Sequence, residues 1–124
     1  MAQYMLILRG GEDSWKSLTP EQTREAYQRY FDWSARLERE NRARGGNELY
    51  PTGRVVRTNG QGIVDGPYAE TKEGIGGYFI VEAADYDDAV QVARGCPILL
   101  HDGFVEIREC VDHSGGAAAR GADA

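Results

Sequence analysis

Three short apolar runs have the length and pattern of β-strands. Residues 4–9 form the first run, which ends at Arg9 and is followed by two glycines. Residues 78–82 (YFIVE) form a second run, and residues 105–108 alternate as Val-Glu-Ile-Arg. We therefore expect a strand at each of these three places.

A β-hairpin is predicted near the middle of the chain. Asn59-Gly60 separates residues 54–58 from residues 61–65. Asn-Gly between two such runs is typical of a two-residue hairpin turn, because both residue types tolerate positive φ. The two runs are therefore the expected arms of one hairpin.

A long helix is predicted to begin at about residue 20. Thr19, Pro20 and Gln22 combine an N-cap threonine, a proline at the first helical position and the third-position glutamine of a capping box. Helical periodicity then gathers large apolar side chains on one face, where core packing explains them without a ligand. The residues of this face are Ala26, Tyr27, Tyr30, Phe31, Trp33 and Leu37. Gly45-Gly46 is the expected end of this helix.

A second, shorter helix is predicted after the strand at residues 78–82. Asp85 has the character of an N-cap, and Asp88 follows it three residues later. The apolar pattern continues to about Arg94. We expect a helix between these positions.

The predicted order is strand, helix, hairpin, strand, helix, strand. This order favours an α+β fold, a ferredoxin-like sandwich in which two helices cover one face of an antiparallel sheet. The uncovered face should then be polar, yet Met5 and Ile7 are apolar on the face opposite Tyr4, Leu6 and Leu8. Covering this apolar face would stabilise an association, so we expect a homodimer packed through the sheet face.

The length of 124 residues fits a single domain. We assign residues 1–112 to it and expect residues 113–124, rich in glycine and alanine, to be a mobile tail. No stretch approaches the ~20 apolar residues that span a bilayer, and the first residues lack a charged leader. We therefore expect a cytoplasmic protein without a membrane partner.

The formal net charge of −6 argues against direct nucleic-acid binding, because contacts to phosphates need clustered lysine and arginine. The only lysines are Lys16 and Lys72. Arginines do occur between residues 36 and 44, but glutamates interleave with them. This segment is predicted to be a solvated helix face.

The cysteines and histidines are too dispersed for a metal site. Cys96, Cys110, His101 and His113 do not have the spacing of zinc ligands, and we interpret the cysteines as reduced structural thiols. The glycines of residues 74–77 precede a strand and not a helix, which is the wrong context for a phosphate-binding loop. No metal or other cofactor is predicted.

Residues 65–73 (DGPYAETKE) concentrate acids, a base and a stiff turn before Gly76-Gly77. This run resembles the signature of YCII-related proteins of the DGPF group, with Tyr68 where that group usually has phenylalanine. The resemblance covers residues 3–111, approximately. Further similar segments are residues 4–8, 12–15, 18–21 and 105–108.

Asp65 is the candidate catalytic residue of this run. An aspartate at a turn usually accepts a hydrogen bond from the N–H two residues later, but that residue is Pro67, which has none. Asp65 is left to bond the N–H of Tyr68, a more distant donor or a ligand. In an apolar cleft its charged form would be disfavoured unless Lys72 or an arginine approached, which suits a general acid or base. Tyr68, Glu70 and Lys72 are the candidates for substrate binding; the structural alternative is that Asp65 fixes the turn while Glu70 and Lys72 pair on the surface.

The resemblance implies a dimeric α/β barrel, in which two paired sheets enclose clefts. It also implies, for some members, lyase-type chemistry by an aspartate and a histidine. The aspartate matches Asp65, but the histidine has no counterpart, because no histidine precedes His101. We interpret His101 as an exposed loop residue without a catalytic role.

We therefore expect a small-molecule ligand in a cleft near residues 65–68, with acid–base lyase or isomerase activity as a hypothesis. The competing hypothesis is a non-catalytic interaction or regulatory module. It is implied by the association of DGPF proteins with alternative sigma factors.

Overall fold

The strands form two separate antiparallel sheets. The computed structural model describes residues 1–56, 63–66 and 74–114. Four strands form the main sheet in the order β2-β5-β1-β6, and β3 pairs only with β4 in a second sheet. The strands are β1 (Ala2–Gly10), β2 (Ala43–Glu48), β3 (Gly53–Val56), β4 (Ile63–Gly66), β5 (Ile75–Ala83) and β6 (Gly103–Glu109).

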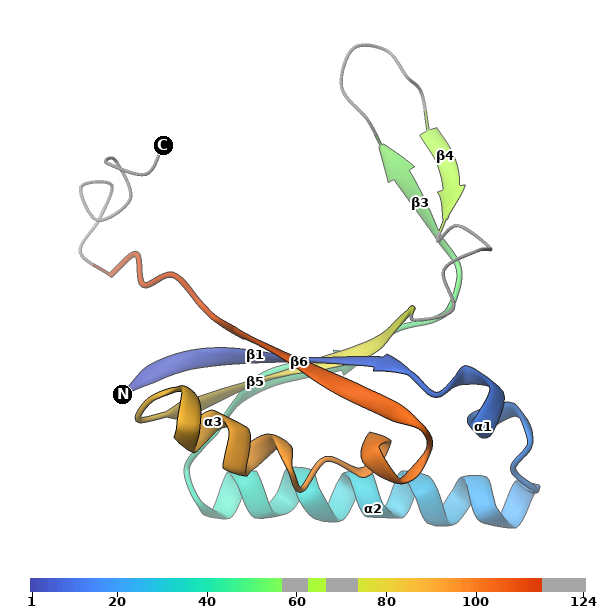
Figure 1. The fold of residues 1–124 in the computed structure, drawn as a ribbon, viewed down its shortest axis with the longest axis horizontal. Helices are drawn as coiled ribbons and strands as arrows, with labels where there is room; N and C mark the ends of the chain where they lie inside the picture. Colours follow the sequence, from blue (N-terminus) through green and yellow to red (C-terminus); the bar gives the residue numbers. More distant parts are fainter. Residues whose placement is uncertain (57–62, 67–73, 115–124) are drawn as a thin grey trace.

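Two helices cover one face of the main sheet, and no helix of the described residues lies over the other face, called the helix-free face below (Figure 1). The helical elements are α1 (Glu12–Lys16), α2 (Pro20–Arg39), α3 (Tyr86–Ala93) and the 3₁₀ helix η1 (Pro97–Leu100). The succession β1-α2-β2-β5-α3-β6, with β1 and β5 at the centre of the sheet, is the ferredoxin-like arrangement. The predicted α+β fold is therefore confirmed.

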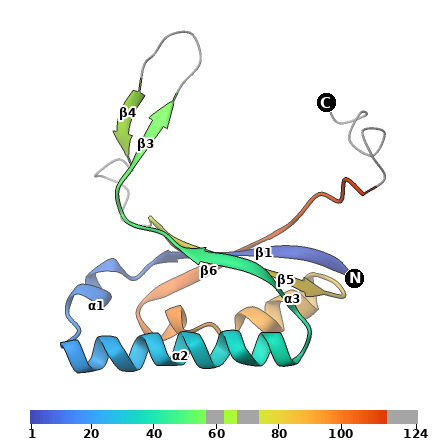
Figure 2. The same ribbon diagram turned by 180° about the vertical axis from the view of Figure 1, so that it is seen from behind.

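The hairpin β3–β4 is an insertion between β2 and β5 and not part of the main sheet. Both ribbon views show it rising on the side of the sheet opposite α2 and α3 (Figures 1 and 2). Its register pairs Val56 with Ile63 and Arg54 with Asp65, which is the register that a two-residue connection would impose. The predicted hairpin arms are confirmed over residues 54–56 and 63–65. The rest of the arms and the connection at Asn59-Gly60 lie outside the described residues.

The start of α2 follows its sequence signal. Thr19 Oγ1 accepts a hydrogen bond from the Gln22 N–H at 3.1 Å, and Gln22 Oε1 accepts one from the Thr19 N–H at 2.9 Å. This is the predicted capping box, in which each residue satisfies the other's free backbone donor. The helix ends at Arg39, however, and Asn41 follows with a left-handed φ of 58°.

Gly45-Gly46 lies inside β2 and does not end α2, so that prediction is wrong. Gly45 and Gly46 have φ values of 132° and 154°, which side-chain-bearing residues rarely adopt. A Cβ at Gly46 would lie 2.6 Å from the Tyr78 carbonyl oxygen. The two glycines therefore allow this edge strand to lie close against β5.

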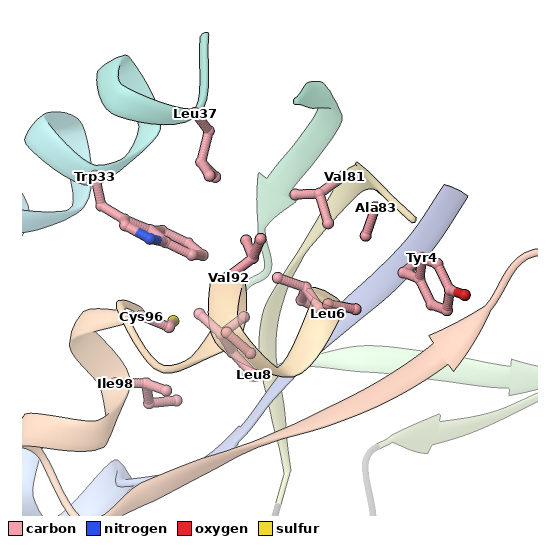
Figure 3. Packing of buried hydrophobic residues seen from close by; sticks show 12 residues of the cluster. Tyr4, Leu6, Leu8, Trp33, Leu37, Val81, Ala83, Val92, Cys96 and Ile98 are labelled. Atoms are coloured by element: carbon pink, nitrogen blue, oxygen red, sulfur yellow. The ribbon is translucent and has the colours of Figure 1, made fainter. Parts of the chain in front are cut away.

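The hydrophobic core lies between the main sheet and the helices (Figure 3). Alternation along β1 turns Tyr4, Leu6 and Leu8 into this layer. Phe31, predicted on the apolar face of α2, is 65% exposed and does not belong to the core. The buried cluster comprises Tyr4, Leu6, Leu8, Trp33, Leu37, Val81, Ala83, Ala89, Val92, Ala93, Cys96 and Ile98.

The second helix also begins as predicted. Asp85 is the N-cap of α3, and its Oδ1 accepts a hydrogen bond from the Asp88 N–H at 2.8 Å. The C-cap is Arg94. The strands expected at residues 4–9, 78–82 and 105–108 correspond to β1, β5 and β6.

Candidate functional site

The hairpin that carries Asp65 is anchored at one end of the main sheet. Strands β1 and β2 finish at this end, while β5 and β6 begin there, because all neighbouring pairs are antiparallel. Two backbone hydrogen bonds tie the neighbouring segments together: the Gly10 N–H donates to the Gly74 carbonyl at 3.2 Å, and the Leu49 N–H donates to the Gly76 carbonyl at 2.9 Å. The segment between β2 and β5 therefore begins and finishes at the same end of the main sheet.

Of the predicted site residues, only Asp65 falls within the described part of the chain. It lies in β4, and its backbone is opposite that of Arg54 in β3. Tyr68, Glu70 and Lys72 lie outside the described residues. The catalytic role of Asp65 and the binding roles of the other three remain predictions.

The helix-free face of the main sheet has an apolar centre. Met5 is opposite Ile80 in the register of β1 and β5, and Ile7 is opposite Tyr78. These four side chains project away from the helices, because their neighbours along each strand are turned toward the core. All four are half-buried in the single chain. The Tyr78 hydroxyl accepts a hydrogen bond from the Asn47 amide at 3.0 Å, which fixes the tyrosine over this face.

Ion pairs border this apolar centre along β6. Glu106 contacts Arg9 at 2.9 Å and Arg108 at 3.3 Å. The hydrogen bonds from Arg9 and Arg108, in that order of importance, lower the pKa of the Glu106 carboxyl below its ordinary value. Glu106 is therefore held as a carboxylate beside an apolar surface.

On the opposite border, Arg44 of β2 pairs with Glu82 of β5. The helix-free face thus has the composition of many protein interfaces, with an apolar centre and a charged rim. Such a face can bind another protein surface by shape and charge together.

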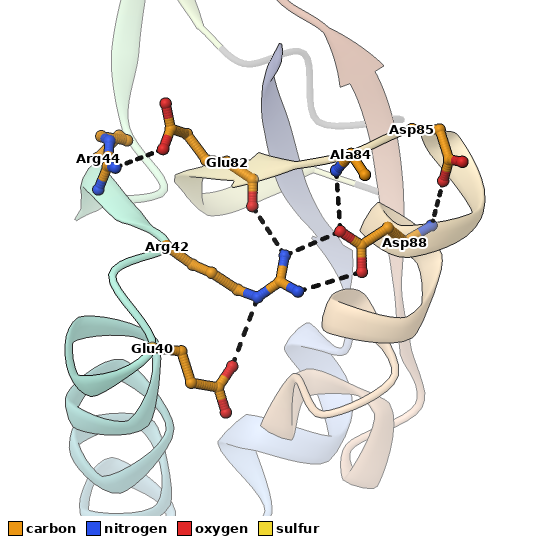
Figure 4. Close-up of polar contacts among 7 residues, drawn as sticks. All are labelled: Glu40, Arg42, Arg44, Glu82, Ala84, Asp85 and Asp88. Atoms are coloured by element: carbon orange, nitrogen blue, oxygen red, sulfur yellow. Dashed lines mark hydrogen bonds and ion pairs between the residues drawn. The ribbon is translucent and has the colours of Figure 1, made fainter. Parts of the chain in front are cut away.

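A second cluster of charges, centred on Arg42, is structural (Figure 4). The Arg42 guanidinium contacts both carboxylate oxygens of Asp88, at 3.0 and 3.2 Å, and donates to the Glu82 carbonyl at 3.0 Å. Asp88 also accepts a hydrogen bond from the Ala84 N–H at 2.9 Å. The predicted solvated helix face is therefore wrong for Arg42 and Arg44, which both follow the end of α2. Arg42 joins the segment after that helix to β5 and α3, and Arg44 lies in β2.

His101 is buried, which contradicts the exposed loop position expected for it. His101 is 9% exposed, and its Nε2 atom has no hydrogen-bond partner among the described residues. The Trp15 ring packs edge to face against the imidazole, with ring centroids 5.8 Å apart. Sequence reasoning missed this environment because the five-residue helix α1, which carries Trp15, has no long apolar period to predict it.

Within residues 1–56, 63–66 and 74–114, no group of three or more histidine, cysteine, aspartate or glutamate side chains has the arrangement of a metal site. Among the helices of those same segments, none combines the length and the apolar character needed to cross a membrane.

The fold and this face together define an α+β ferredoxin-like protein with an apolar, charge-bordered sheet surface and a projecting hairpin. The family model of the YCII-related domain matches residues 2–114 of the chain. The chain therefore belongs to the YCII-related family. No curated protein matches it.

Proposed function

We propose that this protein is a homodimer that binds a small molecule in a cleft between its two sheets, with Asp65 facing the ligand. The observation that carries the proposal is the position of the hairpin β3–β4. It projects beyond the helix-free face, so a second copy packed on that face would lie beside the first copy's hairpin (Figures 1 and 2).

The hairpin itself favours such an arrangement. A lone two-stranded hairpin is at best marginally stable in water, because it has no sheet or helix to bury its apolar side. Val56 of β3 is 74% exposed in the single chain. Contact with a partner copy would cover this side chain and stabilise the hairpin that contains Asp65.

The helix-free face favours the same partner. The half-buried side chains of Met5, Ile7, Tyr78 and Ile80 are surrounded by charged residues of both signs. A two-fold symmetric interface brings a surface against itself, which requires such self-complementary charge. A cleft between two such faces would have apolar walls.

Asp65 would supply the chemistry of this cleft. A carboxyl group beside apolar walls resists ionisation, and Arg54, opposite Asp65 in the register of the hairpin, is a cation that would oppose that effect. In its carboxylate form a group tuned in this way could accept a proton from a carbon next to a carbonyl group, and the resulting carboxylic acid could return that proton elsewhere on the substrate. Isomerase or lyase activity on a small carbonyl compound is the corresponding reaction class.

The test is a thermal-shift and turnover screen of small keto and hydroxy acids with wild-type protein, Asp65→Asn and Asp87→Asn. Asp87 is an exposed residue of α3 on the other side of the sheet and serves as the matched control. We expect the Asp65 variant alone to lose stabilisation by the ligand and to lose turnover. Equal responses in all three proteins would remove Asp65 from the site and favour the interaction module.

A further inference from the structure

A second candidate site lies on the helix side of the main sheet, near the end where the hairpin is anchored. It is centred on His101, between η1 and β6. The residue is about nine-tenths buried, and its Nε2 atom is buried without a hydrogen-bond partner in the described segments. Buried polar atoms in proteins are nearly always paired, so an unpaired one indicates a place for a group that the chain does not itself provide.

The other unpaired buried nitrogen, Nε1 of Trp33, has a different explanation. A Cβ at Gly95 would lie only 2.9 Å from this nitrogen, and the same position is 3.0 Å from the Arg36 guanidinium. The indole N–H is therefore covered by backbone and leaves no room for a ligand. His101 is the stronger candidate for this reason.

The backbone around His101 fixes the position of its ring. The His101 N–H donates to the Ile98 carbonyl at 3.0 Å. The His101 carbonyl approaches Gly11 so closely that a Cβ there would be 2.7 Å away. Asp102, the next residue, has a left-handed φ of 60°, which is uncommon for a residue with a side chain. Such local strain around a buried polar group is typical of binding sites.

An aromatic wall covers the imidazole. Trp15 packs edge to face against His101 and also against Tyr27, with centroid separations of 5.8 and 5.2 Å. The Tyr27 hydroxyl donates a hydrogen bond to Glu48 Oε2 at 2.9 Å. Burial, followed by this hydrogen bond, raises the pKa of Tyr27, so its hydroxyl keeps its proton.

The element that carries Trp15 is weakly attached. Helix α1 has five residues, none of them buried, and its N-cap Gly11 provides no side-chain hydrogen bond. Segments with few buried contacts open at low free-energy cost. Movement of α1 would take the indole away from His101 and free the volume that it occupies against the His101 and Tyr27 rings.

We propose that this space is a binding site for a small, uncharged planar ring that carries a hydroxyl or carbonyl oxygen, with His101 Nε2 as the hydrogen-bond partner of that oxygen. A flat apolar ring in the place of the indole would take over its edge-to-face contacts with His101 and Tyr27. A neutral imidazole offers one donor and one acceptor, so it can pair with either kind of oxygen. The Glu48 carboxylate beside Tyr27 disfavours an anionic ligand. This site lies on the helix side of the main sheet, opposite the side of the proposed Asp65 cleft, so its test does not depend on that cleft.

The test uses phenol as the probe and toluene as a matched ring without the hydroxyl. Both are titrated into ¹⁵N-histidine-labelled protein while the imidazole nitrogens of His101 and His113 are followed by NMR. His113 is exposed in the C-terminal segment and serves as the internal control. We expect saturable phenol shifts at His101 Nε2, none at His113, and about a tenfold preference for phenol over toluene.

Two substitutions separate binding from folding. His101→Phe keeps a flat ring and His101→Leu keeps a similar volume, and both remove the unpaired nitrogen. We expect either variant to melt at or above the wild-type temperature and to lose the preference for phenol. The control variant His113→Phe should keep the preference for phenol. Equal binding of phenol and toluene by the wild type, phenol shifts that bypass His101, or an unchanged preference in the His101 variants would overturn the proposal.

Discussion

Arg42 and Asp88 join the segment after α2 to α3 through a two-pronged contact, with the two terminal guanidinium nitrogens of Arg42 on the two carboxylate oxygens of Asp88. Their side chains are 22% and 26% exposed, so water screens the pair only in part. Asp88 also caps the preceding backbone through the Ala84 N–H. The pair thereby fixes the packing of α3 against the segment that leads into β2.

Replacing Arg42 should destabilise the fold. Arg42→Met keeps the aliphatic length but removes the guanidinium donors from Asp88 and from the Glu82 carbonyl, which costs more than the loss of an exposed ion pair. We expect the melting temperature to fall by several degrees. The control is Arg24→Met, an exposed residue of α2, which should melt close to the wild type. Equal melting of the two variants would show that the Arg42 contacts contribute nothing to stability.

Stability should also decrease in acid. The pKa of Asp88 lies below its ordinary 3.8, mainly through the hydrogen bond from Arg42, and the pKa of Glu106 lies below its ordinary 4.5, mainly through that from Arg9. The unfolded chain therefore binds these protons first, so their contribution is complete above about pH 5 and is lost as the pH falls through the folded values. Urea unfolding measured at falling pH should follow this direction. In the Asp88→Asn variant the loss of stability on acidification should be smaller than in the wild type. An unchanged dependence of stability on pH would exclude Asp88 from the effect.

The element pattern of the fold could be predicted where local signals and tertiary packing agree. The Thr19 capping box, the Asp85 cap and the alternation of β1 each specify the observed element. Strand β2 could not be predicted, because Ala43–Glu48 has two glycines and little apolar content. Its conformation comes from pairing with β5, a tertiary interaction that local sequence does not encode.

The candidate site was predictable only in part. The position of Asp65 in a hairpin arm followed from the Asn-Gly signal and the flanking runs. The burial of His101 depends on Trp15, more than eighty residues earlier in the chain, and on the close approach of Gly11. Contacts between such distant positions leave no periodic pattern in a single sequence.

Gly103 should tolerate no side chain. At the start of β6, a Cβ would lie 2.4 Å from Ile98 Cγ1 and 2.9 Å from the Arg9 carbonyl oxygen. Gly103→Ala therefore overpacks the contact between η1 and β1 and should cost about 1–3 kcal/mol of unfolding free energy. The control is Gly76→Ala, where a Cβ meets nothing within 4 Å, and it should be neutral or slightly stabilising. Chemical denaturation of both variants measures the difference, and a neutral Gly103→Ala would contradict this packing.

The two cysteines should differ in reactivity. Cys96 is buried in the core, and burial raises the pKa of its thiol to about 11, whereas Cys110 is half-buried after β6. At mildly alkaline pH, thiol labelling of native protein should be about 100-fold slower at Cys96 than at Cys110. The rates should converge in denaturant. Comparable rates in the native protein would mean that Cys96 is accessible.

The most direct test of the account is sedimentation of the wild type, Ile7→Glu and Leu100→Glu at about 50 µM, where a standard-sized specific interface would be populated. Ile7 lies at the apolar centre of the helix-free face, while Leu100 is 66% exposed on η1 and serves as the control for an added acid. The account predicts twice the 13.7 kDa chain mass for the wild type and Leu100→Glu, and one chain mass for Ile7→Glu. A monomeric wild type, or an Ile7→Glu variant that remains dimeric, would contradict a homodimer built on this sheet face.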